Sequence, residues 1–78
     1  MSLSFVVEQA GCESCARLVR GALEPLATVE SIEVDEDADA ATVRLTGEAT
    51  EDDVNLALAA ASEGSGHEYR VRPGSWRG

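Results

Sequence analysis

The order in which two hydrophobic periodicities follow one another restricts the fold more than any other feature of this sequence. In some segments apolar residues alternate with polar ones, which is typical of a strand with one buried face. In others they recur every three or four positions, which is typical of an amphipathic helix. The resulting order is strand, helix, strand, strand, helix, strand. These segments are residues 3–8, 15–26, 28–37, 41–47, 51–64 and 67–72. We expect Leu26 on the buried face of the first helix, whose length Pro25 limits, and Thr50 as the N-cap of the second helix. The acidic run from Asp35 to Asp39 is expected to form a turn.

Two strand–helix–strand halves in succession predict one architecture. Because crossovers within a sheet are right-handed, the halves close into a four-stranded antiparallel sheet with both helices on one face. This is an α+β fold, the ferredoxin-like βαββαβ sandwich. We expect a single domain over residues 1–78, with a core at about residues 3–72 and a loose C-terminal tail at 73–78.

Charge and composition argue against several classes of partner. The 78 residues include fifteen Asp and Glu against six Arg and no Lys, for a formal net charge of −9. Nucleic acids and anionic membrane surfaces attract basic proteins, so we expect no nucleic-acid partner. No apolar run approaches the roughly 20 residues of a membrane-spanning helix, so we also expect no membrane insertion and a cytoplasmic location.

The two cysteines, Cys12 and Cys15, stand in the segment "GCESC" where the first predicted strand gives way to the first predicted helix. We expect Cys12 to be exposed in the loop and Cys15 to lie in the first helical turn. The free N–H groups and the dipole of a helix N-terminus favour thiolates, which are soft metal ligands. Two sulfurs suit Cu(I) better than Zn(II), which usually takes four ligands. In a reducing cytosol such a pair indicates metal binding or redox chemistry rather than a structural disulfide.

Two further side chains are candidates for the same site. His67, the only histidine, begins the last predicted strand. Glu13 lies between the cysteines and is more simply explained as a solvated residue that favours the helix N-terminus than as a ligand. We therefore expect Cys12 and Cys15 to be the metal ligands, with His67 as a possible third contact.

The chain resembles the heavy-metal-associated domain family from Leu3 to about Val71. The resemblance rests on the segments "GCESC", "CARLVRGALEPLATVESIEVD" and "ATVRLTGEATEDDVNLAL", in this order. The family comprises small copper chaperones and the N-terminal metal-binding domains of metal-transporting P-type ATPases. Membership would imply that Cys12 and Cys15 bind Cu(I), or in some branches Zn(II), Cd(II) or Hg(II). It would also imply transfer of the ion by ligand exchange to the cysteines of a transporting ATPase or another metal-trafficking protein, which is transport and not catalysis.

The chain departs from the family pattern beside the cysteines. Ala10 stands where the family usually has Met, and Gly11 stands where it usually has Thr or a similar polar residue. The family commonly ends its second helix in a Gly–aromatic pair close to the metal loop, and the nearest match here is Gly66 with His67.

Three other hypotheses remain open from the sequence. The cysteine pair could serve a thiol redox module that needs no metal. The chain could be a metal-free interaction or regulatory domain of the same fold, whose partner binding would survive replacement of both cysteines by Ser. An exposed pair of thiolates could also bridge two copies of the chain through a shared metal, which would give a metal-bridged homodimer.

Overall fold

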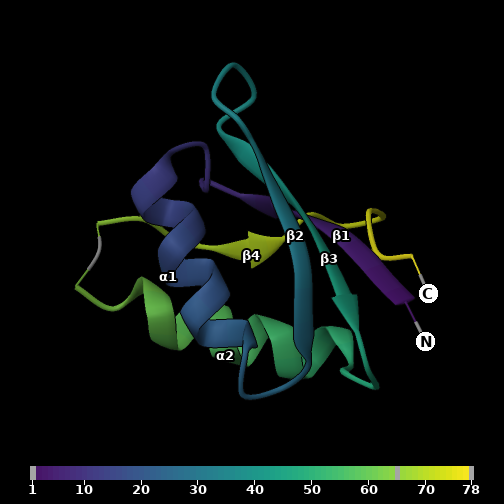
Figure 1. Ribbon diagram of the computed structural model, residues 1–78. Helices are drawn as coiled ribbons and strands as arrows, with labels where there is room; N and C mark the ends of the chain where they lie inside the picture. Colours follow the sequence, from purple (N-terminus) through teal and green to yellow (C-terminus); the bar gives the residue numbers. More distant parts are fainter. Residues whose placement is uncertain (1, 65, 78) are drawn as a thin grey trace.

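The computed structural model describes residues 2–64 and 66–77, which form a four-stranded sheet covered on one face by two helices (Figure 1). In the sheet the strand order is β2-β3-β1-β4, and each neighbouring pair is antiparallel. The predicted ferredoxin-like α+β architecture is therefore confirmed. The elements are β1 (Ser2–Glu8), α1 (Glu13–Leu23), β2 (Thr28–Asp35), β3 (Ala40–Thr46), α2 (Glu51–Ser62) and β4 (Arg70–Val71).

The hydrophobic core lies between the sheet and the helices. On β1 every second side chain is buried, namely Leu3, Phe5 and Val7. The helices cover this face with buried residues at helical spacing. These are Cys15, Val19 and Leu23 of α1 and Val54 and Leu58 of α2. The two periodicities of the sequence thus meet in one apolar layer.

Local chemistry explains where α2 begins and where α1 ends. Thr50 caps α2 by accepting a hydrogen bond on its hydroxyl from the N–H of Asp53 at 3.1 Å, as predicted. α1 ends at Leu23, two residues before Pro25, which lacks the N–H that would continue the helix. Leu26 was expected on the buried helical face, but it lies beyond this end and is 40% exposed.

A β-bulge in β2 explains an irregular part of the sequence pattern. Val29 and Ile32 are an odd number of positions apart, so they would lie on opposite faces of a regular strand. The pairing with β3 shifts between Val29 and Ser31, which makes Glu30 an extra residue. As a result Val29, Ile32 and Val34 all stand opposite buried residues of β3.

The last strand is shorter than predicted. The sequence pattern predicts a strand over residues 67–72, but β4 covers only Arg70–Val71. The two residues before it use side-chain partners instead of a strand ladder. The N–H of Glu68 donates to Oε1 of Gln9 at 3.1 Å, and the N–H of Tyr69 donates to the hydroxyl of Ser62 at 2.8 Å.

The C-terminal segment is not the loose tail that we expected from the sequence. Ser4 and Arg77 exchange two backbone hydrogen bonds of 2.9 and 2.8 Å, and the N–H of Val6 donates to the hydroxyl of Ser75 at 3.1 Å. The ring of Trp76 stacks on Phe5 with centroids 5.1 Å apart. The segment therefore extends the β4 edge of the sheet and adds an aromatic side chain to the core.

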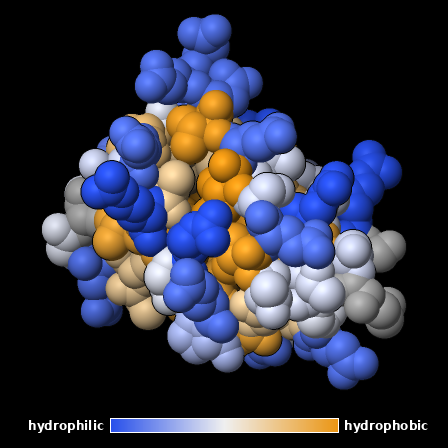
Figure 2. Space-filling model, in the orientation of Figure 1, coloured by the Kyte–Doolittle hydropathy of each residue, from blue (hydrophilic) through white to orange (hydrophobic). Residues whose placement is uncertain are grey.

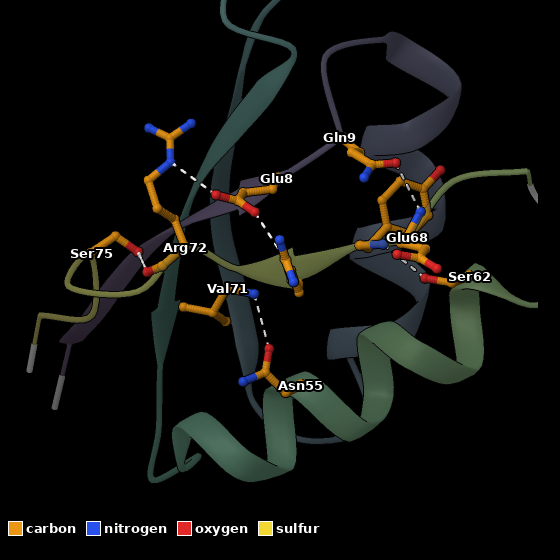
Figure 3. A network of polar contacts seen from close by, with 10 residues as sticks. Glu8, Gln9, Asn55, Ser62, Glu68, Val71, Arg72 and Ser75 are labelled. Atoms are coloured by element: carbon orange, nitrogen blue, oxygen red, sulfur yellow. Dashed lines mark hydrogen bonds and ion pairs between the residues drawn. The ribbon is translucent and has the colours of Figure 1, made fainter.

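Glu8 forms the polar link between β1 and β4 (Figure 3). Its two carboxylate oxygens face Nε of Arg70 at 2.9 Å and Nε of Arg72 at 3.5 Å. The hydrogen bond from Arg70, with a further contribution from Arg72, holds the pKa of Glu8 below its ordinary value. Asn55 of α2 adds a second link, because its Oδ1 accepts from the N–H of Val71 at 2.9 Å.

The surface carries apolar side chains among many charged ones. Figure 2 shows a narrow band of hydrophobic side chains down one face, with hydrophilic side chains on both sides. Within residues 2–64 and 66–77, neither helix has the length and apolar character needed to cross a membrane. The large apolar side chains that are most exposed are Leu18, Leu26, Val34 and Leu56.

Replacing Trp76 tests the docking of the C-terminal segment. We expect Trp76→Ala to lower the free energy of unfolding by about 1–2 kcal/mol, because it removes the stacking on Phe5 and part of the buried apolar area. Trp76→Phe keeps an aromatic ring and should lose less. Urea denaturation followed by circular dichroism measures both variants. An unchanged midpoint for Trp76→Ala would show that the segment adds no stability.

The Glu8 link predicts a pH-dependent contribution to stability. The pKa of Glu8 in the folded protein is below its unfolded value of about 4.5, so the stabilisation is present above that pH. It is lost as the pH falls through the folded pKa. We therefore expect Glu8→Gln to be less stable than wild type at neutral pH and the gap to close in acid. A matched Glu48→Gln variant, at an exposed loop position, should show no such closing gap.

Candidate metal centre

Cys12 ends the loop after β1 and caps the N-terminus of α1. Its backbone is extended, its carbonyl accepts from the N–H of Ala16 at 3.0 Å, and its sulfur accepts from the N–H of Cys15 at 3.3 Å. In most helices an oxygen of Ser, Thr, Asp or Asn fills this position. Here the sulfur lies beside the free N–H groups of the first helical turn, which favour a negatively charged ligand.

Cys15 lies in the first turn of α1, as predicted, and is only 2% exposed. Cys12 is half-buried, whereas we expected it to be exposed in the loop. The two Cα atoms are 5.2 Å apart, and the sulfurs are joined in a disulfide. The fold therefore brings both predicted sulfurs to one point, with Cys15 rooted in the core and Cys12 partly open to solvent.

The turn between β2 and β3 packs against the loop that carries Cys12. The N–H of Gly11 donates to Oδ1 of Asp39 at 3.3 Å. A Cβ atom added to Gly11 would lie 2.5 Å from the Cα of Asp39, so a side chain at this position would collide with the backbone of the turn. Figure 1 shows this turn at the same end of the molecule as the start of α1. Glycine is thus required here for a close approach of two backbones.

A second contact holds the loop from its other side. Oε1 of Gln9 accepts from the N–H of Glu68, just before β4 (Figure 3). Between the two contacts lies Ala10, whose side chain is fully buried in the core cluster that also contains Cys15. The loop is therefore fixed by one small apolar side chain and by two hydrogen bonds to other segments.

The remaining candidates, His67 and Glu13, lie on two different segments of the chain. His67 lies between α2 and β4, and its ring stacks on that of Tyr69 with centroids 5.8 Å apart. Glu13 is exposed in the first turn of α1. Within the part of the chain that the structure describes, no three His, Cys, Asp or Glu side chains are grouped closely enough to hold a metal ion together. The donor set that the fold assembles is the two sulfurs.

A comparison with known protein families shows where this arrangement belongs. The sequence profile of the heavy-metal-associated domain matches residues 4–68, which is most of the chain. The chain belongs to the heavy-metal-associated domain family. The matched region contains the cysteine pair, both helices, most of β1, and all of β2 and β3.

Solved structures show the same fold. A structure from work on crosstalk between Cu(I) and Zn(II) homeostasis is 27% identical, with a TM-score of 0.59 over 88% of this chain and 97% of the other. Oxidized MerP from Ralstonia metallidurans CH34 is 16% identical, with a TM-score of 0.60 over 92% of this chain and 99% of the other. None of the curated proteins searched matches the chain.

Sequence reasoning found the sulfurs of this heavy-metal-associated domain but missed the residues that fix their loop. Asp39 was seen only as part of an acidic turn, and Gln9 was not singled out. A glycine directly before Cys12 was a signal of close backbone approach, but it does not say which segment approaches. That partner depends on the sheet register, which brings the β2–β3 turn and the end of β1 together.

Proposed function

We propose that this heavy-metal-associated domain binds a soft metal ion, with Cu(I) as the favoured cargo, between the thiolates of Cys12 and Cys15. The observation that carries this proposal is the placement of two sulfurs at one helix N-terminus, where free N–H groups favour thiolates. Two thiolates satisfy the low coordination number that Cu(I) accepts, whereas Zn(II) usually requires four ligands. Family membership supports a soft-metal role independently of the geometry.

Metal binding requires the reduced pair. A thiol reductant supplies two electrons and two protons to the disulfide, which becomes two thiols and leaves the reductant oxidised. Cu(I) then displaces the two thiol protons and is bound by two thiolates. A reducing compartment such as the cytoplasm keeps the pair in this form, and we place the domain there.

Transfer to a partner follows from the unequal burial of the two ligands. Cys15 is held in the core, whereas Cys12 is partly exposed. A thiolate of a partner can therefore approach the ion beside Cys12 and bind before Cys12 leaves, so the ion never enters bulk solvent. The partner we propose is a metal-transporting P-type ATPase or another protein that presents cysteines. In this role the domain carries an ion and catalyses no reaction.

A thiol redox function is the second candidate, because the structure holds the same pair as a disulfide. In that case the pair would cycle between disulfide and dithiol against a cellular thiol pool, and a metal would not be needed. Metal affinity and reduction potential, measured on the same protein, distinguish the two functions.

Anaerobic titration of the reduced protein tests the proposed cargo. With Cu(I) and a competing chelator, we expect one tightly bound ion per chain, because the two thiolates form one site. Zn(II) should bind more weakly, since the two sulfurs leave its coordination incomplete. The Cys12→Ser, Cys15→Ser double variant should retain no tight Cu(I) site. Weak Cu(I) binding by wild type would contradict the proposal and leave the redox function as the stronger candidate.

Sedimentation of the same samples tests whether a shared ion joins two copies. A partly exposed thiolate can coordinate an ion held by a second copy of the chain, so we expect the sedimentation coefficient to rise with protein concentration when Cu(I) is supplied at one ion per two chains. The apo protein and the double Cys variant should sediment as monomers at the same concentrations. Equal behaviour of loaded and apo protein would contradict the homodimer.

A further inference from the structure

The loop that carries Cys12 is anchored to a segment with no assigned role in the site. Asp39, at the end of the turn between β2 and β3, accepts the N–H of Gly11 on Oδ1 at 3.3 Å. This N–H belongs to the peptide between Ala10 and Gly11, one peptide before that of Cys12, in the short loop between β1 and α1. We propose that Asp39 is a positioning residue for the sulfur pair, which fixes the direction in which Cys12 presents its sulfur.

The turn is ordered enough to serve as an anchor. Within it, the N–H of Ala38 donates to Oδ1 of Asp35 at 3.2 Å, and the N–H of Asp39 donates to the carbonyl of Glu36 at 3.3 Å. Asp39 itself has φ of +50°, a left-handed conformation that Asp and Asn tolerate better than most residues. This conformation places its carboxylate next to Gly11, and the missing Cβ of Gly11 leaves room for its backbone.

Both residues that anchor this loop, Gln9 and Asp39, have a strained backbone with positive φ. Within residues 2–64 and 66–77, the non-glycine residues with positive φ are Gln9 and Asp39. The side chain of each residue makes a contact that holds the loop carrying Cys12. Gln9 accepts a hydrogen bond from the N–H of Glu68, and Asp39 accepts one from the N–H of Gly11. Strain of this kind persists only where the surroundings compensate for it, and it is typical of functional sites.

The hydrogen bond from Gly11 to Asp39 affects the geometry of the two sulfurs through the backbone of Cys12. The capping contact from the N–H of Cys15 to the sulfur of Cys12 requires the extended backbone that Cys12 adopts, with φ of −134° and ψ of 161°. Gly11 is the most flexible neighbour that Cys12 could have. Without Asp39, the N–H of Gly11 loses its acceptor, so the Ala10–Gly11 peptide is no longer held and Gly11 can change its conformation beside Cys12. The two sulfurs then adopt the arrangement of the pair less often.

Two substitutions at Asp39 separate its hydrogen bond from its charge and its backbone strain. Asp39→Gly removes the acceptor but adopts a positive φ readily. Asp39→Asn removes the charge but keeps both an oxygen acceptor and tolerance of the left-handed region. Asp39 is exposed, so we expect both variants to fold, and urea denaturation verifies this.

Two equilibrium measurements on the full chain test the proposal. The first is the equilibrium constant for reduction of the Cys12–Cys15 disulfide by dithiothreitol without metal, and the second is Cu(I) affinity in competition with a chelator. We expect Asp39→Gly to be reduced about three- to tenfold more readily and to bind Cu(I) weaker by a similar factor, as for the loss of one hydrogen bond. Asp39→Asn should stay within about twofold of wild type in both measurements, because its hydrogen bond is retained.

The Cu(I) measurement rests on the proposed function, whereas the disulfide measurement does not. If wild type binds no Cu(I), the proposed cargo is wrong, and the disulfide equilibrium alone decides the role of Asp39. An unchanged equilibrium in Asp39→Gly would overturn the proposal. Equal shifts in Asp39→Gly and Asp39→Asn would also overturn it, because they would assign the effect to the carboxylate charge and not to the hydrogen bond.

Discussion

The pairing of β1 on both of its edges is the constraint on which the rest of the structure depends. β3 pairs with it along its whole length, and β4 and the segment around Arg77 pair with its other edge. Its buried face supplies the centre of the core, while Glu8 at its end binds Arg70 and Arg72. The loop that leaves this strand therefore starts from a fixed point, and so does the helix that carries the cysteines.

Cys15 is both a residue of the hydrophobic core and one of the two sulfurs of the candidate site. As a core residue it cannot move far without opening a cavity, so its sulfur is the fixed member of the pair. Cys12 sits at the boundary of the same core, and its sulfur is both a helix cap and one half of the site. Such a pair can hold one ligand firmly while it offers the other for exchange, which is the requirement for an ion carrier.

The sequence predicted those parts of the fold that depend on short-range pattern. The alternation in β1, the Thr50 cap and the stop before Pro25 are local signals, and the structure agrees with them. The C-terminal segment was misjudged because Gly and Pro obscure a strand whose partners are more than 60 residues away. Asp39 was missed for the same reason, since its contact with Gly11 spans 28 residues and depends on the sheet register.

Two hydrogen bonds compensate for the small size of Ala10 beneath the loop that carries Cys12. A small side chain fills little volume beneath the loop, so apolar packing alone would hold it weakly. Here Gln9 and Asp39 hold the backbone on either side of Ala10 by hydrogen bonds. Hydrogen bonds depend on direction more strongly than apolar contacts do, so the bond to Asp39 fixes the orientation of the Ala10–Gly11 peptide, one residue before Cys12. The loop can thus be well positioned without a large buried anchor, and its sulfur stays near the surface where a partner can reach it.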